Sequence, residues 1–274
     1  MKQKNRLMIF LSALFVCILT PILILCLQRR QSLRIACVGD SITYGAGISN
    51  ISRNSYPAKL QKFLGSLYQV KNFGASGYTL QKSGDYPYWE NENFQKSLDF
   101  APDIVLLMLG TNDAKPQNWK DPEAFLSDYR EIIRYYQELD NSPQLYLMTP
   151  ATVFPQNTDP ALPDNDYDIS AETVDLITEL IRNLAQELNL PLIDIHQATS
   201  SHPEFFREDG VHPSAEGAEF IARQVYEAKK TDSSFQLNLP ISFLLFSDIP
   251  GRPDSLPEYH HRSRQNSRYT RGRQ

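Results

Sequence analysis

A short apolar segment that ends abruptly in Gly39-Asp40-Ser41 is the strongest constraint on how this chain can fold. Residues 33–38 are mostly apolar, which is typical of a buried strand. Glycine and aspartate favour turns, so we expect this strand to deliver Ser41 to a tight turn. A serine hydroxyl is a weak nucleophile without a neighbouring base. A nucleophilic Ser41 therefore needs a histidine, a carboxylate that orients it, and hydrogen-bond donors for an oxyanion.

Short apolar runs alternate with segments of helical periodicity after residue 30. The runs predict strands at residues 33–38, 68–73, 103–109, 144–149 and 191–195. The periodic segments predict helices at residues 57–64, 122–139, 170–188 and 214–229, with Asp121, Ser170 and Ser214 as N-caps. This alternation predicts an α/β fold, a parallel sheet with helices on both faces. Ligands of such sheets bind at the carboxyl ends of the strands.

The two ends of the chain differ in composition from its middle. Residues 7–27 are apolar or uncharged between basic flanks, and a helix of that length can span a bilayer core of about 30 Å. No small-residue cleavage site follows, so we expect residues 1–30 to be an uncleaved membrane anchor that holds the catalytic domain outside the cytoplasm. Residues 31–230 are the predicted folded domain. Residues 231–274 are a predicted extension that ends in a largely disordered basic tail.

Charge and cysteine content exclude several classes of function. The net charge is −5, and basic residues concentrate at the two ends, so residues 31–230 carry the acidic excess. An acidic domain would repel a phosphate backbone, so we expect no nucleic-acid partner. The three cysteines are Cys17, Cys26 and Cys37, which leaves no pair within the predicted domain and no Cys/His metal spacing. We therefore expect neither a disulfide scaffold nor a metal site.

Two histidines are candidates for the base that activates Ser41. His212 lies in Asp209-Gly210-Val211-His212, where the aspartate precedes the histidine across a glycine turn. This spacing can place the carboxylate against imidazole Nδ1 and leave Nε2 to face the serine. An ordinary surface turn would have the same sequence. His196, after the strand at residues 191–195, lacks the glycine turn and is the alternative base.

Oxyanion donors are expected at the ends of neighbouring strands. Asn112, in Gly110-Thr111-Asn112-Asp113, offers a side-chain amide. Gly74 offers a backbone N–H with no side chain in the way, and Ser41 offers its own N–H at the start of a helix. Turn formation alone would also account for these glycines, and we expect Asp113 to fix the local turn.

These blocks together resemble a known family. Gly39-Asp40-Ser41, Gly74, Gly110-x-Asn112-Asp113 and Asp209-x-x-His212 stand in the order and strand-end contexts of the SGNH hydrolases, also called the GDSL esterase/lipase superfamily. The resemblance covers roughly residues 33–229. It implies a flavodoxin-like, three-layer α/β/α sandwich with strand order 2-1-3-4-5. It also implies a Ser41–His212–Asp209 triad and an oxyanion hole from Ser41, Gly74 and Asn112. Acyl transfer through such a triad needs no metal or organic cofactor, and we expect none.

Two aromatic segments are similar to those of bacterial carbohydrate O-acetylesterases, including sialate O-acetylesterase-like proteins. Tyr86-Pro87-Tyr88-Trp89 and Lys115-Pro116-Gln117-Asn118-Trp119 follow strand-end loops. Trp89 and Trp119 are therefore candidates for sugar contact, and packing is the alternative. The Pro-, Asn- and Asp-rich residues 151–169 could form a wall of the pocket or an ordinary surface loop.

We expect the protein to be a serine ester hydrolase that removes a short acyl group from a small acylated substrate. The expected acyl group is acetyl, and the expected substrate is a glycan. One alternative is lysophospholipase, thioesterase or acyltransferase chemistry on the same triad. The predicted anchor and the apolar residues 240–246 favour such lipid substrates. The other is a catalytically silent glycan-binding module, against which the complete set of polar residues argues.

Overall fold

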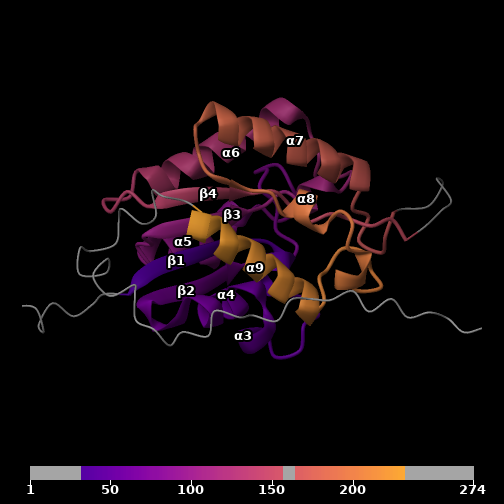
Figure 1. Ribbon diagram of the computed structural model, residues 1–274. Helices are drawn as coiled ribbons and strands as arrows, with labels where there is room; N and C mark the ends of the chain where they lie inside the picture. Colours follow the sequence, from indigo (N-terminus) through magenta and orange to yellow (C-terminus); the bar gives the residue numbers. More distant parts are fainter. Residues whose placement is uncertain (1–31, 157–163, 232–274) are drawn as a thin grey trace, which may run out of the picture. The chain divides into compact units, whose positions relative to one another are not determined.

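A computed structural model describes residues 32–156 and 164–231 of the chain. Within them, five strands form a sheet in the order β2-β1-β3-β4-β5, and every neighbouring pair is parallel (Figure 1). This confirms the parallel α/β sheet and the order 2-1-3-4-5. The strands are β1 (Leu33–Gly39), β2 (Tyr68–Gly74), β3 (Ile104–Met108), β4 (Gln144–Met148) and β5 (Leu192–Ile193).

Helices connect the strands and cover both faces of the sheet. The α-helices in the described part of the chain are α2 (Ser41–Tyr44), α3 (Ile51–Asn54), α4 (Tyr56–Leu64), α5 (Glu92–Asp99), α6 (Pro122–Gln137), α7 (Ala171–Glu187), α8 (Ile195–Thr199) and α9 (Ala215–Thr231). Short 3₁₀ turns are η1 (Gly65–Leu67), η2 (Tyr88–Glu90), η3 (Asn112–Ala114) and η4 (Pro203–Phe205). Helices α4 and α9 pack together on one face, and α5, α6 and α7 cover the other (Figure 1).

The alternation of side chains along β1 shows how one strand serves both layers. Ala36 and Val38 point into the core under α5, α6 and α7, together with Leu107 of β3. Cys37 points to the opposite face and meets Tyr56 of α4. Burial raises the pKa of the Cys37 thiol far above its usual range, so the side chain behaves as a small apolar filler.

Side-chain caps set the helix starts, as the sequence predicts. Asp121 accepts the N–H of Ala124 at the start of α6, and Ser170 accepts the N–H of Thr173 at the start of α7. The Ser214 hydroxyl accepts the N–H of Gly217 just before the body of α9. Each cap satisfies a backbone donor that the first turn leaves free.

The fifth strand is shorter than predicted. The sequence places residues 191–195 in a strand, whereas β5 ends at Ile193. Asp194 accepts the N–H of Gln197 and caps α8, so Ile195 becomes the first residue of a helix. The capping preference of aspartate thus outweighs the apolar run on either side of it.

The predicted segments at the two ends of the chain lie outside the described residues. In residues 32–156 and 164–231, no helix has the length and apolar character to cross a membrane. The expected anchor at residues 7–27 and the extension after residue 231 therefore stay predictions.

Candidate active site

Ser41 stands at the carboxyl end of β1, as the first residue of α2. Asp40 caps this short helix, because its Oδ1 accepts the N–H of Ile42 at 2.9 Å. The cap turns the chain sharply from strand to helix and leaves Ser41 at the corner. Asp40 is fully buried, and this burial raises its pKa. Its contacts make it a structural residue of the turn.

His212 is the imidazole that the fold brings to Ser41. Its Nε2 lies 2.9 Å from the Ser41 Oγ. Its Nδ1 lies 3.1 Å from Oδ2 of Asp209, and Oδ1 of Asp209 accepts the backbone N–H groups of Val211 and His212. An uninterrupted series of contacts therefore runs from a carboxylate through an imidazole to a hydroxyl.

The electrostatics of Asp209 fix the direction of these hydrogen bonds. Burial acts to raise its pKa, but the N–H groups of His212 and Val211 and the imidazole more than offset this, so the pKa is lowered. The carboxylate is therefore ionised near neutral pH and can only accept. A neutral His212 must then donate from Nδ1, which leaves Nε2 free to accept the proton of the Ser41 hydroxyl.

A glycine makes the turn between Asp209 and His212 possible. Gly210 has φ +68°, and a Cβ there would lie 2.1 Å from the carbonyl oxygen of Phe154. In turn, Phe154 donates its N–H to the Gly210 carbonyl at 2.9 Å, and its ring packs on Phe206. The segment that follows β4 thereby holds the Asp209–His212 turn in place.

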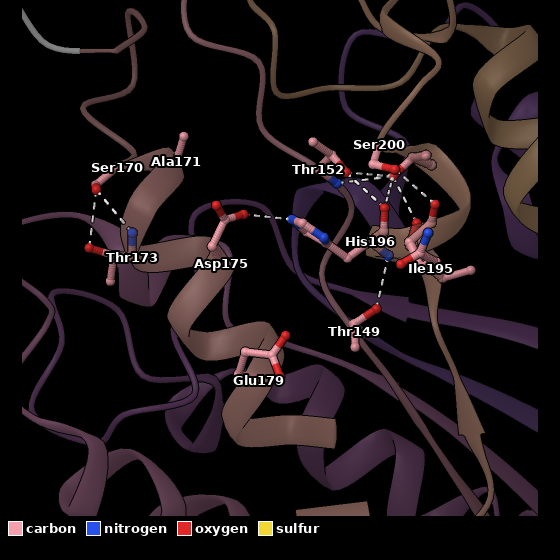
Figure 2. Close-up of polar contacts among 12 residues, drawn as sticks. Thr149, Thr152, Ser170, Ala171, Thr173, Asp175, Glu179, Ile195, His196 and Ser200 are labelled. Atoms are coloured by element: carbon pink, nitrogen blue, oxygen red, sulfur yellow. Dashed lines mark hydrogen bonds and ion pairs between the residues drawn. The ribbon is translucent and has the colours of Figure 1, made fainter. Parts of the chain in front are cut away.

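His196, the alternative base, is engaged elsewhere. It lies in α8, and its Nε2 is 2.9 Å from Oδ1 of Asp175 on α7 (Figure 2). Its backbone N–H donates to Oγ1 of Thr149 at 2.9 Å (Figure 2). Of the two candidate histidines, only His212 contacts Ser41.

Asn112 and Ser41 each have an N–H group that is free to bind an oxyanion, as the sequence predicts. Asn112 is buried at the end of β3, and its Nδ2 donates one hydrogen to the carbonyl of Tyr78 at 3.0 Å. The second amide hydrogen has no partner within the described residues. The backbone N–H of Ser41 likewise has none there. Asn118 holds Asn112 in place by donating to its carbonyl at 2.9 Å.

The prediction that Gly74 is an oxyanion donor is wrong. Its N–H donates to Oδ1 of Asn72 at 2.9 Å and is therefore already used. The glycine is needed for packing, because a Cβ at this position would lie 2.2 Å from the backbone nitrogen of Tyr44. Gly74 allows α2 to approach the end of β2.

Gly77 has the free donor that Gly74 lacks. Its N–H has no partner within residues 32–156 and 164–231. The next residue, Tyr78, holds the Asn112 amide through its carbonyl, so Gly77 stands beside the other donors. Gly77 has φ +85°, a backbone conformation that the sequence does not reveal. Its signal in the sequence is weak: a second glycine three residues after the strand end.

Asp113, which is expected to fix its own turn, instead holds the loop that contains Leu80 and Gln81. Its two carboxylate oxygens accept the N–H groups of Leu80 and Gln81 at 2.8 and 2.7 Å. Burial raises its pKa to about 7, and these two donors oppose the shift. The contact ties the loop that carries Gly77 and Tyr78 to the end of β3.

Tyr167 is a site residue that the sequence does not single out. Its ring meets the His212 imidazole edge to face, with centroids 4.9 Å apart, and it is 43% exposed. Asn165 positions it, because Oδ1 of Asn165 accepts the N–H groups of Tyr167 and Ile169. The described end of the loop at residues 151–169 therefore forms a wall beside His212, one of the two roles expected for this segment.

Trp89 and Trp119 have the contacts of packing residues. The Trp89 Nε1 donates to the Leu80 carbonyl at 2.7 Å, and its ring packs edge-on against Phe94. Trp119 packs on Phe125, and both indoles adjoin the core under α6. A sugar contact by either indole stays a prediction.

The chemistry that this arrangement can perform follows from its polar groups. The imidazole can take a proton from the hydroxyl, the carboxylate can stabilise the resulting cation, and the free donors can bind an anion. In the part of the chain that the structure describes, no group of three or more His, Cys, Asp or Glu side chains is placed to hold a metal ion.

Several solved structures share this fold. They include a carbohydrate acetylesterase from Sinorhizobium meliloti (TM-score 0.59, 20% identity, covering 73% of this chain and 98% of that chain). A lipase/acylhydrolase from Enterococcus faecalis matches with a TM-score of 0.58 at 21% identity, covering 72% and 95% of the two chains. An aryl esterase from M. smegmatis matches with a TM-score of 0.56 at 18% identity, covering 73% and 98%. At these identities the likeness establishes the fold alone.

Sequence comparison identifies the family. An acetylxylan esterase from Xylanibacter ruminicola is 32% identical over an alignment of 219 residues, and the match covers 74% of this chain and 44% of that protein. The chain thus spans less than half the length of this relative. The GDSL-like lipase/acylhydrolase family matches residues 37–220, a range that contains Ser41, Asn112, Asp209 and His212. The chain therefore belongs to the GDSL-like lipase/acylhydrolase family.

Proposed function

We propose that this protein is a serine esterase that removes acetyl groups from a carbohydrate. The observation that carries the proposal is the series of contacts from Asp209 through His212 to Ser41, at 3.1 and 2.9 Å. Two similar proteins support the substrate class, since one is named an acetylxylan esterase and the other a carbohydrate acetylesterase.

In the first step, the Ser41 Oγ attacks the carbonyl carbon of the acetyl ester while Nε2 of His212 takes the hydroxyl proton. The distance of 2.9 Å between these atoms allows direct transfer. The ionised Asp209 holds the imidazole in the required tautomer and stabilises the imidazolium that forms.

The oxyanion of the tetrahedral intermediate is bound by three donors in this proposal. They are the backbone N–H groups of Ser41 and Gly77 and the free amide hydrogen of Asn112. Gly77 takes the place that the sequence gives to Gly74. Donors that are already oriented in the free enzyme stabilise the charge without reorganisation, and each is typically worth about 10²–10³ in kcat.

The intermediate collapses when His212 returns its proton to the sugar oxygen. The bond between the acyl carbon and that oxygen breaks, the sugar leaves with a free hydroxyl, and the acetyl group stays on Ser41. A water molecule then attacks the acetyl-enzyme with His212 as base, and acetate leaves as Ser41 regains its proton.

We also propose that residues 7–27 anchor the protein to a membrane. Strand β1 begins at Leu33 and ends next to Ser41. Because the strands are parallel, Leu33 lies at the amino ends of the strands, and Ser41 lies at their carboxyl ends. The strand's seven residues separate the two ends by roughly 23 Å. In this proposal the anchor is joined to the folded domain through the start of β1. Alkaline extraction of membranes tests the anchor: release of the full-length protein would contradict it.

Acetate release from acetylated xylan by the full-length protein tests the activity, with Ser41→Ala as the control. We expect acetate from the wild type and at least a 10³-fold lower rate from the variant. A series of p-nitrophenyl acetate, butyrate and octanoate tests the acyl group, and we expect kcat/KM to fall beyond butyrate. A rise toward octanoate would favour lysophospholipase or thioesterase chemistry, and glycan binding without turnover would favour a binding module.

A further inference from the structure

An open groove of about 510 Å³ lies next to the site, between α3, α4 and the end of β2. Tyr44 and Gly74 belong to its lining, so we call it the Tyr44 groove. Tyr44 stands three residues after Ser41 on the single turn of α2, which places their Cβ atoms roughly 5–6 Å apart. The Tyr44 groove therefore borders the short helix that carries Ser41, while Ser41 itself is not part of its lining.

The lining of the Tyr44 groove carries no charged side chain. Charged residues make up 22% of the sequence, and another open pocket of similar volume is lined by Arg34, Lys71, Lys96 and Asp99. A phosphate or carboxylate ligand would find no cation in the Tyr44 groove. Its occupant should therefore be neutral.

Three polar atoms of the lining have no partner within the described residues. Ser55, which is 2% exposed, is the N-cap residue of α4, yet its hydroxyl makes no capping hydrogen bond and has no other partner within the described residues. Asn93 donates its amide hydrogen to the Gly74 carbonyl, and this leaves its Oδ1 free to accept. The Tyr44 hydroxyl is free as well, and the Tyr44 side chain is 43% exposed.

We propose that the Tyr44 groove binds the unesterified sugar residues of an oligosaccharide whose acetyl group lies at Ser41. An aromatic face, two hydroxyls and an amide oxygen, without charge, match the flat apolar faces and hydroxyl groups of neutral sugar rings. The inference rests on the proposed function for the ester, and it adds that the enzyme recognises a chain of sugars.

Chain-length dependence tests the proposal. The measured quantity is the ratio of kcat/KM for acetylated xylotetraose to kcat/KM for acetylated xylose. We expect Tyr44→Ala to lower this ratio about tenfold and Ser55→Ala about threefold, since tenfold corresponds to roughly 1.4 kcal/mol. Ser55→Ala removes no capping bond, so it should fold normally. Tyr135→Ala is the matched control, because Tyr135 is 42% exposed on α6, and it should leave the ratio unchanged.

A binding measurement separates this proposal from the proposed function. Unacetylated xylotetraose is titrated against Ser41→Ala and against the double variant Ser41→Ala/Tyr44→Ala by calorimetry. Binding that is lost in the double variant supports the groove even when the wild type hydrolyses no acetylated sugar. Equal affinity of the two variants, or an unchanged ratio in Tyr44→Ala, would overturn the proposal.

Discussion

Replacement of Asp209 by asparagine should nearly abolish catalysis and leave the fold intact. Oδ1 of Asp209 accepts the N–H groups of Val211 and His212, and an asparagine oxygen can keep both bonds. The amide NH₂ would then take the position of Oδ2, 3.1 Å from Nδ1 of His212. Two donors cannot face each other, so Nδ1 would have to become the acceptor and the ring proton would move to Nε2.

The size of the loss follows from this change of tautomer. An imidazole that carries its proton on Nε2 cannot accept the Ser41 proton across 2.9 Å. Loss of the correct tautomer in a Ser-His-Asp triad lowers kcat by about 10⁴, which corresponds to about 5 kcal/mol of transition-state stabilisation. The free energy of unfolding should fall by only about 1 kcal/mol, because a neutral oxygen replaces a carboxylate in the two backbone hydrogen bonds.

Hydrolysis of p-nitrophenyl acetate gives kcat, and thermal unfolding gives Tm for the same samples. Asp175→Asn is the matched control, because Asp175 stands 2.9 Å from an imidazole that does not contact Ser41, that of His196. We expect Asp175→Asn to keep its kcat. Retention of more than a tenth of the wild-type kcat by Asp209→Asn, with an unchanged Tm, would refute the role of Asp209 in setting the tautomer of His212.

Three further results are expected. Asn112→Ala removes one oxyanion donor, so kcat should fall about 10²–10³-fold with little change in KM, and an unchanged kcat would exclude this role. The lowered pKa of Asp209 keeps it ionised at pH 5–8, so its contribution to stability is lost only as the pH falls through that lowered pKa. Catalysis by a neutral imidazole base should make kcat/KM fall toward acid pH, and a flat pH–rate profile would contradict it. Asp113→Asn turns an NH₂ toward the N–H of Leu80 or Gln81 and should lower the free energy of unfolding by about 1–3 kcal/mol, and an unchanged denaturant midpoint would contradict this.

The sheet could be predicted because its strands are buried and apolar. The runs that form β1 and β3 stand out in the sequence, since both faces of each strand lie under helices. The end of β5 could not be read in this way. There the side chain of Asp194 caps α8, and this local hydrogen bond ends an apolar run that looks continuous.

The triad could be predicted because short local motifs place its members at strand ends and in a tight turn. The spacing of Asp209 and His212 is set within one turn, so sequence distance reports their geometry. The choice between Gly74 and Gly77 depends on which N–H is already bonded, and that is decided by the Asn72 side chain. Tyr167 reaches His212 only through the path of a long loop, which no local pattern encodes.

Capture of the acyl-enzyme tests the central claim, that Ser41 is the nucleophile. The full-length protein is quenched with acid during hydrolysis of p-nitrophenyl acetate, digested, and analysed by mass spectrometry. We predict an acetyl group on the peptide that contains Ser41, and neither this adduct nor hydrolysis above background in Ser41→Ala. Equal rates for the wild type and Ser41→Ala, with no acetylated peptide in either, would contradict the serine mechanism.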